Sequence, residues 1–276
     1  MFIDSHTHVF PRHKALNILS KLSRQGDIPH FTNGTIDGLL DSMKTAGIHL
    51  SLISRITTRP EQVASVNRWL YSLKGENILP MATLHPDMPD GPAYMEGLRE
   101  KGFIGIKFHP DYQGFYVDDP RMYPLYETAQ ALRMPILFHA GLDRGLSPPF
   151  RAMPAHLSKV HREFPRLPMI AAHMGGEDNY DQTEEYLLGK DIYLDTAFVL
   201  RLMDQGTLKR FFRKHPIERF LFGSDSPFTD QSTELNYLLH LPFLGAEAKG
   251  KIAGGNASLL FETDTDTGHV GAHRTE

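Results

Sequence analysis

The stretch Phe2-Ile3-Asp4-Ser5-His6-Thr7-His8 is the first of eight short apolar segments, and their regular spacing decides the fold. The remaining segments begin near Leu50, Ile78, Ile104, Pro135, Pro168, Asp191 and Arg219. From the first start to the last, the steps average roughly 31 residues, which is the length of a strand–helix–strand unit. Eight such units predict an α/β protein with a single-domain (β/α)8 TIM barrel.

Amphipathic stretches lie between the apolar segments and predict the outer helices. One of them runs from Thr35 to Ala46, with Gly47 as its stop signal. The others cover residues 61–73, 121–132, 152–164 and 202–214. A doubly wound open sheet would show the same alternation of strands and helices. The even spacing, and the lack of a glycine-rich phosphate loop after the first strand, favour the barrel.

The 276 residues divide into a predicted barrel domain over residues 1–261 and a tail over residues 262–276. The tail is rich in Thr, Asp and Gly, a composition typical of poorly ordered chain. Long connections are predicted after the first and fourth strands, over residues 9–34 and 109–120. Connections that follow barrel strands lie on the catalytic face, so we expect the segments 9–34, 110–120 and 142–153 to set specificity.

The composition excludes several classes of protein. A net charge of −4 with mixed signs offers no basic surface for nucleic acid or for an anionic membrane. The chain contains no cysteine, so a metal would need histidine and carboxylate ligands. No signal peptide or membrane span is evident, and we expect a cytoplasmic protein acting on a small molecule. The sequence allows a homo-oligomer without predicting one.

Residues able to bind metal or move protons gather at the carboxyl ends of the predicted strands. Side chains alternate between the two faces of a strand, and the apolar set must meet the helices, so the other set faces the barrel interior. The residues predicted to face inward are Asp4, His6, His8, Lys107, His109, His139, His173 and Asp225. Periodicity assigns each of their strands independently, yet all of them place these side chains at one end of the barrel.

Imidazoles and a carboxylate at one point predict a metal centre. Three histidines and one aspartate suit a divalent ion such as zinc, which lowers the pKa of bound water from about 15.7 towards about 7. His173 is a candidate to orient the water or shuttle its proton. Asp225, which can contact both metal and water, is a candidate to take that proton and pass it to a leaving group. Asp4 is a candidate acceptor that orients the ring of a ligand histidine.

The chain resembles the amidohydrolase superfamily, most closely the amidohydrolase-related branch that includes the aminocarboxymuconate-semialdehyde decarboxylase type. The motifs that carry the resemblance are Ile3-Asp4-Ser5-His6-Thr7-His8, Gly105-Ile106-Lys107-Phe108-His109-Pro110, Phe138-His139-Ala140-Gly141, Ala172-His173-Met174-Gly175-Gly176, Phe222-Gly223-Ser224-Asp225-Ser226-Pro227 and Gly255-Asn256-Ala257. The resemblance implies one divalent metal bound by His6, His8, His139 and Asp225. It also implies that His173 acts in catalysis.

The number of metals stays open between one and two. Binuclear members of the superfamily bridge two ions with a carbamylated lysine on the fourth strand, where Lys107 lies. His139 and His173 would then hold the second ion. His109 lies nearer the strand end than Lys107, which favours a single metal and leaves both residues as bridging or substrate-contacting candidates.

Two enzyme reactions fit this site. The leading expectation is hydrolysis of a small amide, cyclic amide or lactone by metal-activated water. The alternative is a lyase, a non-oxidative decarboxylase of a small carboxylic acid, which uses nearly the same ligands. Arg55 and Arg144 follow predicted strands and can bind a substrate carboxylate in either reaction. A non-catalytic metal-binding protein leaves the acid–base histidine unexplained, and a TatD-like nuclease would need a glutamate on the fourth strand.

Overall fold

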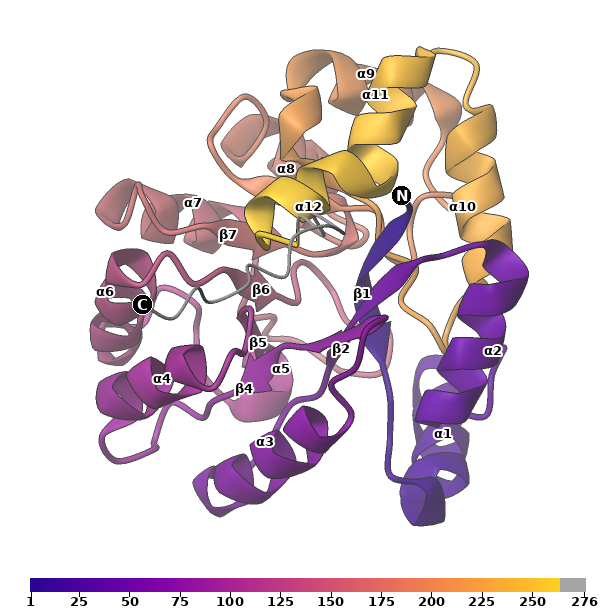
Figure 1. The fold of residues 1–276 in the computed structure, drawn as a ribbon. Coiled ribbons are helices and arrows are strands. Elements are labelled where there is room, and N and C mark those ends of the chain that lie inside the picture. The colour runs from indigo at the N-terminus through magenta and orange to yellow at the C-terminus, as the bar shows by residue number, and fades with distance from the viewer. Residues whose placement is uncertain (264–276) are drawn as a thin grey trace, which may run out of the picture.

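The computed structural model describes residues 1–263 and confirms the single-domain barrel (Figure 1). The strands are β1 (Ile3–His8), β2 (Leu50–Ser54), β3 (Ile78–Pro80), β4 (Ala82–Thr83), β5 (Ile106–Phe108), β6 (Ile136–Phe138), β7 (Met169–Ala171), β8 (Tyr193–Asp195) and β9 (Phe220–Leu221). All neighbouring strands run parallel, in the orders β1-β2-β3 and β4 through β9. Each strand lies within one of the eight predicted segments. The third segment holds two strands, β3 and β4.

Backbone hydrogen bonds close the barrel at two places. The β2 and β4 regions are joined where Met81 N donates to Ile53 O at 2.9 Å. On the other side, Ser5 N donates to Phe222 O at 2.9 Å, and Thr7 forms a parallel bridge with Ser226. The end of the chain therefore returns beside its beginning and completes the ring.

The predicted outer helices are confirmed, with ends that differ by a few residues. Thr35 accepts a hydrogen bond from Gly38 N as the N-cap of α2, and Gly47 ends that helix in the left-handed conformation with φ 69°. The helices are α1 (Arg12–Gly26), α2 (Ile36–Ala46), α3 (Val63–Ser72), α4 (Gly91–Glu100), α5 (Pro110–Gln113), α6 (Tyr123–Ala131), α7 (Pro154–Glu163), α8 (Tyr180–Tyr186), α9 (Gln205–Lys214), α10 (Gln231–His240), α11 (Ala246–Gly250) and α12 (Asn256–Leu260). Short 3-10 turns cover Pro60–Gln62, Pro120–Met122, His173–Gly175 and Ile217–Arg219, and a π turn covers Lys251–Gly255.

Two connections hold more structure than the sequence predicted. The segment 9–34 contains α1, and the segment 109–120 contains the short α5. The spacing of Ala15 and Leu19, both fully buried, supplies the apolar face of α1. In Figure 1, α1 lies at the far end of β1 from the N-terminus, whereas α12 lies near the N-terminus.

Most buried apolar side chains form two clusters, one inside the ring of strands and one between the strands and the helices, as strand alternation requires. The inner cluster includes Ile3, Leu137 and Leu221, and Phe261 packs against it beside the N-terminal end of the barrel. The outer cluster joins Phe108 and other outward-facing strand residues to the helices. Residues 264–276 of the predicted tail lie outside the described residues, and among residues 1–263 no helix combines the length and apolarity of a bilayer span.

The predicted inward direction of Asp4 is wrong, and a β-bulge in β1 is the reason. Asp4 pairs with Ser51 and Thr7 with Ile53, so β1 holds one more residue than β2 over this interval. The extra residue reverses the alternation: Ile3 packs into the barrel interior, and Asp4 turns to the helix side. There the Asp4 carboxylate accepts hydrogen bonds from Ser224 Oγ and from Gln231 Nε2, the latter at 2.7 Å.

A buried histidine far from the strand ends makes stability depend on pH. Burial lowers the pKa of His215 from 6.5 to about 4, and the neutral ring accepts from Gly189 N and donates to Ile192 O. Below pH 6.5 His215 becomes protonated in the unfolded chain, whereas in the folded protein it stays neutral down to about pH 4. The His215 contribution is thus present above pH 6.5 and is lost as the pH falls.

We expect the stability advantage of the wild type over His215→Gln to shrink by about 2 kcal/mol between pH 7 and pH 5, given the two pKa values. Urea unfolding of both proteins at the two pH values measures this difference. A gap that stays constant with pH would show that His215 titrates alike in the folded and unfolded states.

Candidate functional site

A cavity of about 440 Å³ opens at the carboxyl ends of the strands. Its polar end is formed by the residues that the sequence placed there, and helix α1 and the segments after β6 and β9 form much of the remaining wall. The predicted site residues that line it are His6, His8, Arg55, Lys107, His109, His139, Arg144, His173 and Asp225. Asp4 is not among the lining residues.

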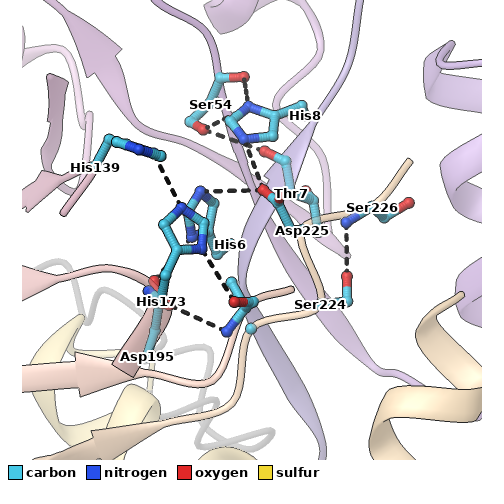
Figure 2. A network of polar contacts seen from close by, with 12 residues as sticks. His6, Thr7, His8, Ser54, His139, His173, Asp195, Ser224, Asp225 and Ser226 are labelled. Atoms are coloured by element: carbon cyan, nitrogen blue, oxygen red, sulfur yellow. Dashed lines mark hydrogen bonds and ion pairs between the residues drawn. The ribbon is translucent and has the colours of Figure 1, made fainter. Parts of the chain in front are cut away.

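Three predicted ligands come together beside β1. The Oδ1 atom of Asp225 lies 3.0 Å from His8 Nε2 and 3.5 Å from His6 Nε2 (Figure 2). Burial raises the pKa of Asp225, but the His8 hydrogen bond and the charge of nearby histidines outweigh it, so the pKa lies below 3.8. The ionised carboxylate and two imidazoles place their ligand atoms within 4.8 Å of one another, a donor set that fits a divalent ion.

The backbone around Asp225 is adapted to this position. Asp225 is in the left-handed conformation with φ 68°, and its N–H donates to His6 O at 2.9 Å. Gly223 allows the close approach, because a Cβ there would lie 2.8 Å from His6 Cβ. His173 also has a positive φ, of 56°, and strain of this kind is concentrated at functional sites.

Asp195, at the end of β8, has the role that the sequence assigned to Asp4. Its Oδ2 atom lies 2.8 Å from His6 Nδ1, and its Oδ1 atom accepts from His173 N at 2.9 Å. This contact orients the His6 ring with Nε2 towards Asp225. Sequence reasoning missed Asp195, although an acidic residue at the end of the seventh predicted segment was a usable signal.

His139 lies outside the group formed by His6, His8 and Asp225 and is paired with His173. Its Nδ1 atom is 3.0 Å from His173 Nε2. The outer nitrogens of the pair face backbone carbonyls, with His139 Nε2 3.2 Å from Leu142 O and His173 Nδ1 3.0 Å from Ala197 O. Carbonyls only accept hydrogen bonds, so each outer nitrogen that bonds to one carries a proton.

Burial and the cationic neighbours hold the His139 pKa well below its usual value. The Asp195 carboxylate accepts from the backbone N–H of His173 and so fixes the position of that residue. Both rings line the cavity, so a hydrogen-bonded pair of imidazoles faces the space a substrate would enter. To act as a metal ligand as well, His139 would have to turn away from this hydrogen bond.

Lys107 and His109 both face the cavity, as the alternation predicted. Lys107 Nζ lies 3.0 Å from His6 Nε2, and burial lowers the Lys107 pKa to about 8. His109 stacks on His139 with centroids 4.0 Å apart and planes 10° apart, and its Nε2 atom is 3.0 Å from Asp143 Oδ2. Two further groups, His109–His139–Asp143 and His139–His173–Glu177, also bring their ligand atoms within 4.8 Å of one another. The stacking disfavours the first of them, because imidazole binds a metal in its ring plane.

The two arginines differ in their partners. Arg144 Nε donates to buried Glu177 Oε1 at 2.9 Å, and a second nitrogen reaches Asp178 at 3.4 Å, so its charge is already compensated. Arg55 lies over the rings of Phe10 and Trp69, at 5.9 and 5.7 Å, and no carboxylate within residues 1–263 pairs with it. Burial lowers the Arg55 pKa. A desolvated guanidinium without a counter-ion is suited to an anionic ligand.

The sequence matches the family model described as Amidohydrolase over residues 3–262. Among solved structures, 5-carboxyvanillate decarboxylase from Sphingomonas paucimobilis aligns with TM-score 0.69 and 15% identity, covering 95% of this chain and 98% of that one. 2,6-Dihydroxybenzoate decarboxylase from Rhizobium aligns with TM-score 0.72 and 18% identity, covering 95% and 99%. No curated protein matches the sequence.

A third solved structure bears on the metal. Dihydroxybenzoic acid decarboxylase from Polaromonas sp. JS666, with bound manganese and 2-nitroresorcinol, aligns with TM-score 0.71 and 17% identity, covering 95% of this chain and 96% of that one. The expected hydrolysis of an amide or lactone is contradicted, because the similar structures are mostly decarboxylases. The two reactions use nearly the same ligands, so the ligand motifs alone did not separate them.

Proposed function

The chain belongs to the amidohydrolase family, and from this we propose that it is a metal-dependent, non-oxidative decarboxylase of a small aromatic carboxylic acid. The observation that carries the proposal is the joint placement, in one cavity, of a metal-ligand group, a hydrogen-bonded histidine pair and an arginine that has no carboxylate partner among residues 1–263. Decarboxylation needs these three functions: charge to bind the acid, a fixed orientation, and a proton for the carbon that loses carbon dioxide.

We propose that His6, His8 and Asp225 hold one divalent ion, with His139 as a further ligand once its ring turns. A divalent ion in such a site supplies positive charge that stabilises anionic groups of the substrate. The imidazole-rich set suits zinc, and the related structure from Polaromonas holds manganese. Metal analysis of protein purified without added ions tests the count: two equivalents, reduced on Lys107→Ala, would contradict a single ion.

His173 is proposed as the proton donor. When the bond between the ring carbon and the carboxylate breaks, its electron pair stays on the ring carbon and carbon dioxide leaves. A proton carried by His173 Nε2 would then form the new carbon–hydrogen bond, which balances the reaction as acid anion plus proton giving arene plus carbon dioxide. Ala197 O contacts the His173 ring at Nδ1, and Asp195 accepts from the His173 backbone N–H, so both residues help to fix the orientation for this transfer.

The reaction is tested by incubating the zinc- and manganese-loaded protein with a panel of hydroxybenzoates and measuring carbon dioxide release. Lactones and amides are assayed in parallel for hydrolysis. Carbon dioxide release that depends on metal and is lost in His173→Asn supports the proposal. Hydrolysis without carbon dioxide release would refute it.

Arg55 is proposed to bind an anionic group of the substrate, and its replacement is expected to weaken binding. Arg55→Met should raise KM by about 10- to 100-fold, the range for one lost hydrogen bond to a charged group, with a smaller change in kcat. Steady-state kinetics on the best acid measure this. Arg68→Met, on the exposed face of α3, is the matched control. An unchanged KM in Arg55→Met would place the substrate elsewhere.

A further inference from the structure

Two adjacent faces of α1 contact different surroundings. Ala15 and Leu19, one helical turn apart, are fully buried in a small cluster with Phe10 and Phe228. Ile18 and Leu22, also one turn apart, are half-buried and line the cavity above the metal-ligand group. The second face therefore presents apolar side chains to the space that the substrate must enter.

The same apolar surface continues on neighbouring segments. Ile28 and Phe198 pack against the small cluster and also line the cavity. We call Ile18, Leu22, Ile28 and Phe198 the apolar wall. It is distinct from the polar end of the cavity, which holds the histidines, Lys107 and Asp225.

Contacts connect the apolar wall to the other segments that line the cavity. Gln25, one turn after Leu22, donates from Nε2 to Gly145 O at 2.6 Å and so joins α1 to the segment after β6. On that segment, the Arg144 guanidinium lies 5.4 Å from the centroid of Phe198. These contacts hold the wall at a set distance from the catalytic groups, which is what a specificity surface requires.

The size of the cavity exceeds the needs of one ring. A cavity of about 150 Å³ is enough to hold benzene in another protein, whereas this cavity measures about 440 Å³. A single-ring acid bound at the polar end would leave Ile18 and Leu22 against water. A larger apolar group would cover them and gain from their burial.

We propose that α1 determines substrate choice, through Ile18 and Leu22, by selecting aromatic acids that carry an apolar substituent about the size of a second ring. This inference rests on the proposed function, because it takes the carboxylate to lie at the polar end of the cavity. It adds the chemical class of the group that points away from the metal.

The test measures binding rather than turnover, by titration calorimetry on the full-length, metal-loaded protein. The probes are benzoate and 2-, 3- and 4-phenylbenzoate. The tightest phenylbenzoate is expected to bind at least about 10-fold more tightly than benzoate, since apolar contacts in an enclosed pocket discriminate to this degree. Equal affinities for benzoate and all three phenylbenzoates would overturn the proposal.

Two opposite changes at Leu22 separate this effect from misfolding. Leu22→Asn removes the apolar contact and Leu22→Phe fills the space, so each should weaken the phenylbenzoate about 10-fold while benzoate changes less than about twofold. Leu16→Asn is the matched control, because Leu16 is 64% exposed on the same helix. Equal effects on both probes, or none, would refute a specificity role for Leu22.

The outcomes also separate the two proposals. Wall-dependent binding without carbon dioxide release from any acid would refute the decarboxylase and support the role of α1. Carbon dioxide release from single-ring acids, with selectivity unchanged in both Leu22 variants, would support the decarboxylase and refute the role of α1.

Discussion

Asp225→Asn is expected to lower the rate of carbon dioxide release by about 10³-fold or more, the scale on which loss of a charged transition-state contact acts. Asn keeps the shape of Asp225 and tolerates its positive φ of 68°, so the backbone bond to His6 O should persist. What is lost is the negative charge between His6 and His8. The measurements are carbon dioxide release and metal content by mass spectrometry.

The control is Asp204→Asn at the N-cap of α9, where Asp204 accepts from Thr207 N and asparagine can do the same. That variant should retain activity and metal. Neither variant should melt at a temperature clearly below that of the metal-free wild type, which would show that both variants fold. Full activity and full metal content in Asp225→Asn would remove Asp225 from the ligand set.

Gly141→Ala is expected to disrupt both stability and activity. Gly141 has φ 89°, and a Cβ there would lie 2.2 Å from Glu177 N and 2.6 Å from Glu177 O. The segment after β6 would have to separate from the segment after β7, breaking the bond from Glu177 N to Ala140 O. Each of these segments directly follows one histidine of the His139–His173 pair, so the contact between the two rings would be lost as well.

We expect Gly141→Ala to lower the free energy of unfolding by about 3 kcal/mol or more, because the clash adds to the cost of a left-handed alanine. Gly47→Ala isolates that second cost: Gly47 has φ 69°, and a Cβ there would meet no atom of residues 1–263 within 4 Å. It should cost only about 1 to 2 kcal/mol and leave activity intact. Equal losses of stability in both variants would show that the close approach at Gly141 is not required.

Strand alternation predicted which side chains face the cavity wherever a strand is regular. In β5 it correctly turned Lys107 towards the cavity, and the same reasoning placed His139 and His173 there. It failed at Asp4, because one inserted residue in β1 exchanges the two faces. A bulge depends on how β1 pairs with β2, and the pattern of apolar and polar residues within β1 does not predict it.

The sequence also could not predict which charged side chains pair with each other. Arg55 and Arg144 look alike as cations that follow a strand, yet only Arg144 meets carboxylates among residues 1–263. Asp195 and His6 are far apart in the chain, and their 2.8 Å contact exists only because the barrel brings β8 close to β1. Long-range polar pairs of this kind carry no periodic signal.

What the sequence by itself determined is the barrel, its outer helices and the end of the barrel where the chemistry lies. These follow from short-range periodicity, since apolar side chains must be buried at intervals that match strands and helices. The tertiary structure alone decided which remote side chains meet. Examples are the contact of Asp195 with His6, the contact of His139 with His173, and the apolar wall that α1 contributes. Such contacts depend on the closure of the ring, which sets distances between residues that are remote along the chain.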